Sequence, residues 1–294
     1  MKRSLVMALG LAGAGAALAV GSGVTRSIAS APRPEPRPEP RQDIALAGEL
    51  TQGGWARGTA PAGIAALALD GKPVSVASDG GFFLAFDRDA GTQARLVARL
   101  ADGSTVTRVL TVAPRAWKLE YIPLGPKPGT PPSEAFRIRR AAELAQINAA
   151  RAIDSHSQGW RQRFVWPVRG RVSGLFGSQR IYNGTPGSYH SGTDIATGAS
   201  GTPFAAPADG VVILAAASPF TLEGNLLMID HGMGLNSAFL HCSQILVRPG
   251  EAVKQGQIIG RIGMTGRATG PHLHWSIKWR DSRLDPMLFT GPMQ

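Results

Sequence analysis

The chain has 294 residues and is 43% hydrophobic, which is enough for a sizeable core and predicts about two domains. Its 37 glycines and 22 prolines argue against a mainly helical protein and favour a loop-rich β architecture. The formal net charge of +11 favours an anionic partner such as anionic lipid, bacterial cell wall or nucleic acid. Nucleic acid is not expected, because no basic run is interleaved with aromatic residues. The single cysteine, Cys242, excludes a disulfide within this sequence.

Residues 1–31 predict an export signal. "MKRSLVMALGLAGAGAALAV" has a short basic start and an apolar run, with small-residue A-x-A patterns at 17–19 and 29–31. We therefore expect an exported protein in the periplasm or cell envelope, tethered to the membrane if the signal is not cleaved. Residues 32–42, which contain "PRPEPRPEPR", predict an extended Pro-rich linker.

Residues 43–125 predict a β-sandwich-like accessory domain. Short β-rich runs are separated by the turn signals Asp70-Gly71, Asp79-Gly80 and Asp102-Gly103. Residues 43–121 contain neither His nor Cys, so no catalytic site is expected there. We expect binding or positioning, including contact with a regulatory protein, and a plain structural spacer is the alternative.

Residues 126–158 predict a linker and a helix. The helix is expected over 133–154, with Ser133 as its N-cap behind two prolines. Four apolar residues recur near helical spacing and predict the face that packs on a domain: Phe136, Ala141, Leu144 and Ile147. Three arginines either bind an anionic polymer or form a solvated face, and we favour the solvated face: Arg137, Arg139 and Arg140.

Residues 159–294 are β-rich again and hold five of the six histidines. In "HSGTD", His190 and Asp194 are four residues apart, and the glycine between them argues against a helix. In "PHLHW", His272 and His274 point to the same side of an extended strand. The preceding "GMTGRATG" allows the backbone to approach closely and aim both rings inward.

These two motifs together predict a metal centre. The candidate ligands are His190, Asp194 and one or both of His272 and His274. Three protein ligands plus a water molecule is the composition of a catalytic zinc site, in which the metal acidifies the water and polarises a carbonyl. Without an H-E-x-x-H sequence, the glutamate base of many metalloproteases has no counterpart here.

The motifs "HSGTD", "FLHCS", "VRPGEAVKQGQIIGRIGMTGRATGPHLHW" and "LDPMLF" resemble, in order and spacing, the lysostaphin/LytM family of zinc endopeptidases over about 163–290. The resemblance implies an antiparallel β-sheet metallopeptidase domain over 159–294 that cuts peptide cross-bridges of peptidoglycan. It implies three Zn²⁺ ligands: His190, Asp194 and His274. It also implies that His241 and His272 activate the water or stabilise the tetrahedral oxyanion.

The sequence departs from the family pattern beside His241. Phe239 replaces the usual tyrosine, and Cys242 replaces the usual aliphatic residue. Some members place a substrate-polarising tyrosine upstream of the first ligand, and here Tyr182 and Tyr189 are both candidates, of which we favour Tyr182. The complete ligand set argues against the metal-free regulators that this family also contains.

Other conspicuous residues have simpler interpretations. We expect Cys242 to be a small buried hydrophobe, His231 to make a structural hydrogen bond in a turn, and His156 to be exposed. Trp275 and Trp279 either line a groove or pack in the core.

Three functions fit the sequence. The first is an exported zinc endopeptidase of peptidoglycan. The second is a non-hydrolytic, cell-wall-bound activator of other peptidoglycan hydrolases on the same fold. The third is a phosphocarrier or lipoyl-type carrier, suggested by the hairpin around Lys254, although an export signal and the residues that flank Lys254 both argue against it.

Overall fold

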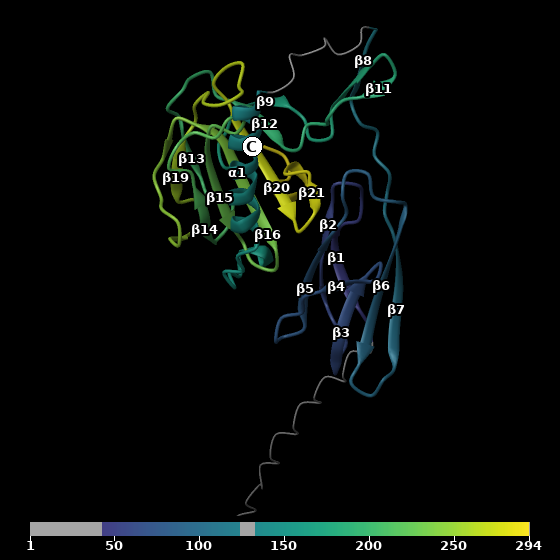
Figure 1. The fold of residues 1–294 in the computed structure, drawn as a ribbon. Coiled ribbons are helices and arrows are strands. Elements are labelled where there is room, and N and C mark those ends of the chain that lie inside the picture. Colours follow the sequence, from purple (N-terminus) through teal and green to yellow (C-terminus); the bar gives the residue numbers. More distant parts are fainter. Residues whose placement is uncertain (1–42, 124–132, 294) are drawn as a thin grey trace, which may run out of the picture. The chain divides into compact units, whose positions relative to one another are not determined.

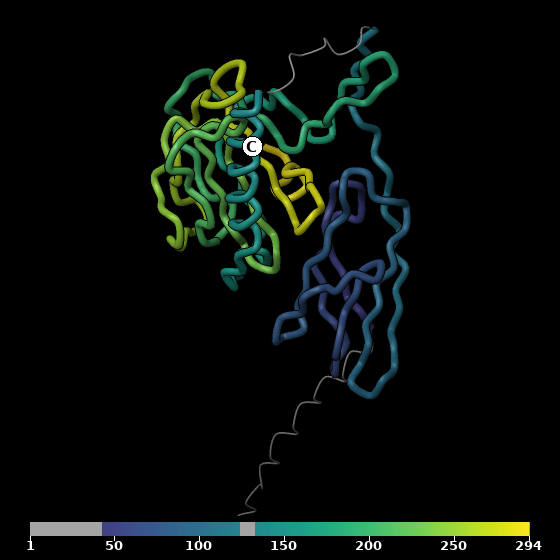
Figure 2. The backbone as a smooth tube through the Cα atoms, viewed as in Figure 1, coloured from purple at the N-terminus to yellow at the C-terminus, as the bar shows by residue number. Residues whose placement is uncertain are grey.

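The computed structural model describes residues 43–123 and 133–293 (Figure 1). The export signal and Pro-rich linker predicted for residues 1–42 lie outside the described residues. No helix within the two described ranges is long and apolar enough to cross a membrane. The chain is mainly β, as predicted, and Figure 2 traces its backbone.

The first seven strands, which we call the N-terminal sheets, form one three-stranded and one four-stranded sheet. Their orders are β1-β2-β5 and β4-β3-β6-β7. The strands are β1 (Ala45–Glu49), β2 (Trp55–Thr59), β3 (Ile64–Leu69), β4 (Lys72–Val74), β5 (Gly81–Ala85), β6 (Gln93–Leu100) and β7 (Thr105–Thr111). The predicted Asp70-Gly71 turn joins β3 to β4, and both residues have the positive φ angles that a tight hairpin turn requires.

The second half is built on a large antiparallel sheet of order β18-β14-β15-β16-β20-β12-β9, with β21 paired to β20. Its strands are β9 (Arg171–Gly174), β12 (Thr193–Ala196), β14 (Gly210–Ala215), β15 (Asn225–Asp230), β16 (Leu235–Cys242), β18 (Ala252–Val253), β20 (Leu273–Trp279) and β21 (Ser282–Leu284). A smaller sheet of order β13-β19-β17 accompanies it, formed by β13 (Pro203–Ala205), β17 (Gln244–Ile245) and β19 (Ile258–Arg261). The antiparallel sheet implied by the resemblance is confirmed.

Both faces of the large sheet are buried. In β15, Leu227 and Ile229 join one hydrophobic cluster, whereas Leu226 and Met228 join another. This alternation follows from the two-residue period of a strand. The first cluster includes Phe204 of β13, whose ring stacks on Phe239 at 5.2 Å. Helix α1 (Glu134–Arg151) covers the other face and can be followed in Figure 1.

Helix α1 begins as predicted, because the Ser133 hydroxyl accepts a hydrogen bond from the Phe136 N–H at 3.1 Å. The predicted packing face is partly wrong, since Leu144 is 42% exposed while Glu143 is buried. Glu143 can be buried because Arg139 and Arg140 pair with it and Thr221 donates two hydrogen bonds to it.

The solvated face predicted for the three arginines is also wrong for Arg140. Its side chain is only 17% exposed and also pairs with Glu223 at 2.6 Å. The face of α1 that packs on the sheet therefore carries the paired side chains of Glu143 and Arg140, whereas Leu144 is exposed.

Strand β8 (Leu119–Ile122) links the two halves of the chain. It pairs in parallel with β10 (Gln179–Tyr182), which pairs in turn with β11 (Thr185–Pro186). The hairpin β10–β11 lies between β9 and β12 in sequence, immediately upstream of His190. A segment assigned by sequence to the accessory domain thus extends a hairpin of the segment assigned to the peptidase domain.

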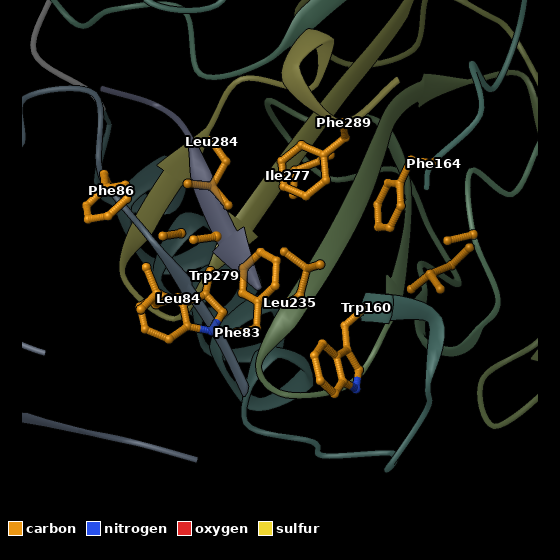
Figure 3. Close-up of a cluster of buried hydrophobic side chains, with 14 of the residues drawn as sticks. Phe83, Leu84, Phe86, Trp160, Phe164, Leu235, Ile277, Trp279, Leu284 and Phe289 are labelled. Atoms are coloured by element: carbon orange, nitrogen blue, oxygen red, sulfur yellow. The ribbon is translucent and has the colours of Figure 1, made fainter. Parts of the chain in front are cut away.

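Aromatic side chains join the N-terminal sheets to the second half of the chain (Figure 3). The Phe83 ring lies 6.2 Å from Trp279 and 6.4 Å from Phe289. Trp55 packs on Phe289 at 5.2 Å and donates its indole N–H to the Leu288 carbonyl at 3.1 Å. Two short helices complete this half: η1 (Gly159–Arg161) and α2 (Met287–Thr290). The core is therefore continuous between the two halves.

Candidate metal centre and active site

Strand pairing brings the two sequence motifs together. In the register of β12 with β20, Asp194 lies directly opposite His274. His190 precedes β12, and its backbone N–H donates to the Ser178 carbonyl at 2.8 Å. The sheet therefore fixes Asp194 and His274, and the turn at 175–178 fixes His190.

Three potential metal-binding atoms converge at this point. His190 Nε2 lies 3.1 Å from both Asp194 Oδ1 and His274 Nδ1, and His274 Nδ1 lies 2.8 Å from Asp194 Oδ1. Tetrahedral zinc with bonds of about 2.0–2.1 Å places its ligand atoms roughly 3.3 Å apart. The three separations are close to this spacing, and the imidazole–carboxylate set suits Zn²⁺.

The surroundings orient these side chains. His190 Nδ1 lies 3.1 Å from the Leu175 carbonyl oxygen, which can only accept, so Nδ1 donates and Nε2 faces the other two atoms. Two glycines leave room for the centre. A Cβ at Gly174 would lie 2.4 Å from Asp194 Oδ2, and one at Gly192 would lie 2.7 Å from His274 Nε2.

Burial and hydrogen bonds set the protonation states of Asp194 and His274. Burial opposes ionisation of Asp194, but hydrogen bonds from His190 and His274 outweigh it and hold the pKa of the carboxyl well below its usual range. Burial lowers the pKa of His274, and its contact with Asp194 only partly compensates. Asp194 is therefore an anion and His274 is neutral at pH 7, the forms in which they can bind a metal. At His190, burial is outweighed by contact with Asp194, which raises the pKa of the imidazole.

His241 and His272 lie beside this group, with ring centroids 5.0 Å apart. Their Nδ1 atoms lie 2.8 Å from the carbonyl oxygens of Thr265 and Gly270 respectively, so each Nδ1 donates and each Nε2 remains available. His272 Nε2 lies 3.8 Å from Asp194 Oδ1. Burial is the largest cause of a lowered pKa at His241, which is therefore neutral at pH 7.

A bulge aims His241. Leu227 pairs with Phe239 but Asn225 pairs with Cys242, so β16 carries one more residue than β15 between these pairs. His241 sits in this bulge with a φ of 64°, an uncommon conformation for a residue other than glycine. Phe239 is fully buried, so the hydroxyl of the tyrosine usual in the family would have met the core rather than substrate.

Two grooves meet at His190 and Asp194. One includes Tyr182, and the other includes His241 and His272. Tyr189 borders both grooves, but its hydroxyl accepts a hydrogen bond from Arg283 at 3.3 Å and its ring lies under Arg88. Tyr182 therefore remains the tyrosine that we favour for a contact with substrate.

The remaining predictions for single residues agree with the structure. Cys242 is fully buried, which raises the pKa of its thiol to about 12. His231 is buried and hydrogen-bonds Asp209 O and Ser237 Oγ, while the His156 side chain is 89% exposed. Of the two alternatives left open for the tryptophans, Trp275 is fully buried in the core, whereas Trp279 is mostly buried but also borders a pocket away from His190.

Two orienting groups were not predicted from the sequence: the carbonyl oxygens of Leu175 and Thr265, which orient His190 and His241. Backbone acceptors carry no side-chain signature, so no motif could have pointed to them.

Comparison with known proteins gives the family. The profile described as Peptidase family M23 matches residues 188–286. This part of the chain belongs to peptidase family M23. The match includes all five residues of the two histidine motifs and the bulge: His190, Asp194, His241, His272 and His274. It confirms the family resemblance that the motifs indicated.

Two curated relatives each match less than half of the chain. It is 38% identical to peptidoglycan DD-endopeptidase ShyA of Vibrio cholerae over 133 residues, 45% of this chain and 30% of ShyA. It is 43% identical to ShyB of the same organism over 104 residues, 35% of this chain and 24% of ShyB. The chain thus spans less than a third of the length of these relatives.

A solved structure is similar over a longer stretch. It is a Pseudomonas aeruginosa protein assigned to peptidase M23, with 29% identity and a TM-score of 0.63. The likeness covers 84% of this chain and 96% of that one. The similarity therefore extends beyond the M23 segment.

Proposed function

We propose that this chain is a zinc-dependent endopeptidase that hydrolyses peptide cross-links of peptidoglycan, with His190, Asp194 and His274 as metal ligands. The observation that carries the proposal is the convergence of these three ligand atoms beside two further histidines whose Nε2 atoms remain available. The relatives ShyA and ShyB are named peptidoglycan DD-endopeptidases, which supports this substrate.

The two histidines beside the ligand set, His241 and His272, have roles in hydrolysis. Cleavage adds a hydroxyl group to the carbonyl carbon and a proton to the leaving amine. When bound, Zn²⁺ supplies Lewis acidity, which polarises the carbonyl and acidifies water. Neutral His241 accepts the proton of the attacking water at Nε2 and passes it on to the leaving amine, so no net proton is consumed. His272, whose Nε2 lies beside the ligand atoms, stabilises the developing oxyanion when Nε2 carries a proton. Tyr182 adds a hydroxyl donor from the adjoining groove.

The groove lining suits an anionic peptide. Lys118, Arg180 and Arg267 border the groove that contains Tyr182, whereas Glu120, the acidic residue beside them, pairs with Arg180 at 2.8 Å. Peptidoglycan stem peptides carry carboxylates, so a net positive rim would favour their approach. We infer that the bond cut is the DD cross-link, by analogy with ShyA and ShyB.

This function requires that the protein reach the cell wall. We propose export to the periplasm or cell envelope by the segment predicted at 1–31. We also propose that residues 43–125 are the site at which a regulatory protein acts. Among the described residues of that range, only Lys118 and Glu120 line the two grooves that meet at His190 and Asp194. The N-terminal sheets therefore do not cover the site.

Digestion of purified peptidoglycan by the full chain tests the proposal. Released muropeptides are analysed by mass spectrometry, with and without a zinc chelator. We expect cross-linked dimers to disappear, and chelator to preserve them. Intact dimers in the presence of one bound zinc per chain would contradict the proposal and favour the non-hydrolytic activator.

A further inference from the structure

Arg88 lies in the loop between β5 and β6 of the N-terminal sheets, yet its side chain reaches the turn that orients His190. We propose that Arg88 is a positioning residue of the metal centre, through which the N-terminal sheets fix the His190 ligand. The inference rests on the proposed function insofar as His190 binds the metal, but it concerns a part of the chain outside the M23 segment.

The contacts of Arg88 are specific. Its Nε and Nη2 donate to the Gly177 carbonyl at 3.2 and 3.0 Å, and Nη2 also donates to Gln179 Oε1 at 3.0 Å. The guanidinium lies over the rings of Trp117 and Tyr189, 5.2 and 4.6 Å from their centroids. Arg88 thus contacts two aromatic rings while it hydrogen-bonds to the turn.

The turn passes this constraint to His190. The Gly177 N–H donates to the His190 carbonyl, and the His190 N–H donates to the Ser178 carbonyl, both at 2.8 Å. The Leu175 carbonyl accepts from His190 Nδ1 at 3.1 Å. Both the backbone and the ring of His190 are therefore set by residues 175–178. Movement of this turn would rotate the imidazole away from Asp194 and His274.

Gly177 makes this arrangement possible. Its φ is 79°, and a Cβ there would lie 2.2 Å from the Trp117 ring. The turn therefore packs directly against the aromatic residue that also stacks on Arg88.

The energetics favour a positioning role over a simple ion pair. Arg88 is only 5% exposed, but its carboxylate partner Asp89 has a side chain that is 62% exposed. An ion pair with a partner so well solvated contributes little to stability. The desolvation of the buried guanidinium is offset mainly by hydrogen bonds to neutral acceptors and by contacts with aromatic rings. The planar guanidinium can make both kinds of contact at once. A lysine could not make the same set of contacts.

The loop that carries Arg88 is itself anchored to both halves of the chain. Asp87 Oδ2 accepts from the Arg283 N–H of β21 at 2.8 Å, and the Asp87 carbonyl accepts from the Gly53 N–H at 3.2 Å. Arg88 therefore projects from a fixed base, which a residue that positions another group requires.

The test measures metal binding by the full-length Arg88→Met chain. Met keeps much of the apolar volume but donates no hydrogen bond. We expect the affinity for Zn²⁺, measured by competition with a chromophoric chelator, to fall about 10- to 100-fold, as for other partners of metal-binding histidines. We also expect a changed visible absorption spectrum of the Co²⁺-loaded chain. Arg88→Lys, which keeps the charge but not the fork, should give an intermediate loss and serves as the test if Arg88→Met does not fold.

Arg115→Met is the matched control. Arg115 lies over the same Trp117 ring and pairs with buried Asp285 at 2.7 Å, but no hydrogen bond joins it to residues 175–190. We expect this variant to lower the free energy of unfolding and to keep the wild-type zinc affinity and Co²⁺ spectrum.

Two results would overturn the inference. Either Arg88→Met binds Zn²⁺ as tightly as wild type with the same Co²⁺ spectrum, or Arg115→Met weakens binding as much as Arg88→Met does. A wild-type chain that binds no zinc would instead overturn the proposed function itself. The two failures are therefore distinguishable.

Discussion

Asp194 and His274 face each other across strands β12 and β20, with His274 Nδ1 2.8 Å from Asp194 Oδ1. This pair belongs to the regular register of the large sheet, so the sheet itself holds two of the three proposed ligand atoms. His190 is held differently, by hydrogen bonds to a turn. The proposed centre therefore combines a pair held by the sheet with a third proposed ligand, His190, that is held by hydrogen bonds to residues 175–178.

Asp194→Asn tests the carboxylate. The amide keeps the shape of the side chain but removes the negative charge that binds zinc. We therefore expect zinc affinity to fall roughly 100-fold or more, which exceeds the loss typical of residues that only hydrogen-bond to a metal ligand. Chelator competition measures this. Asp281→Asn, an exposed carboxylate in the turn after β20, is the control and should bind zinc as wild type does. Equal affinity in both variants would exclude Asp194 as a ligand.

Gly174→Ala tests the space behind the carboxylate. The added Cβ would lie 2.4 Å from Asp194 Oδ2, so the carboxylate must move and zinc binding should weaken. Gly91→Ala, whose Cβ would approach nothing closer than 3.9 Å, should leave zinc affinity unchanged. If Gly174→Ala bound zinc normally, the close packing around Asp194 would not matter for the centre.

His241→Ala and His272→Ala separate catalysis from metal binding. Neither residue is in the proposed ligand set, so each variant should keep one zinc per chain. Loss of the proton-transfer group or of the oxyanion donor should lower kcat for cross-link cleavage about 10²- to 10⁴-fold. The exposed His156→Ala variant should retain full activity. Zinc loss in either active-site variant would argue instead for a role as ligand.

His231 predicts a pH dependence of stability. Burial, which outweighs the hydrogen bond to Asp209 O, lowers its pKa from 6.5 to about 4 in the folded chain. As pH falls, the unfolded chain binds the proton first, so stability present above pH 6.5 is lost between about 6.5 and about 4. The loss should be about 3 kcal/mol, at 1.36 kcal/mol per pH unit.

Urea unfolding of the metal-free chain at several pH values measures this effect. His231→Gln removes the titrating group, so its free energy of unfolding should fall less steeply than that of wild type between pH 6.5 and 4. Parallel curves would show that His231 does not control the acid sensitivity.

Much of the site could be predicted from the sequence because its spacing is local. The four-residue interval between His190 and Asp194 and the two-residue interval between His272 and His274 identify the motifs directly. The Asp70-Gly71 turn and the Ser133 cap are likewise determined by a few adjacent residues.

The features that could not be predicted depend on distant pairs. The buried face of α1 is set by pairing of Glu143 with arginines and with Thr221, which periodicity of apolar residues cannot reveal. The parallel pairing of β8 with β10 and the reach of Arg88 to Gly177 join residues far apart in sequence. Long-range contacts of this kind carry no local signature.

The most direct test of the proposed function is digestion of peptidoglycan by the full chain in ¹⁸O-labelled water, followed by mass spectrometry of the muropeptides. The proposal predicts that cross-linked dimers become monomers, with one ¹⁸O in the newly formed carboxylate of the donor peptide, and that a chelator prevents both changes until zinc is restored. Unlabelled, intact dimers after incubation with a chain that carries one zinc would contradict it.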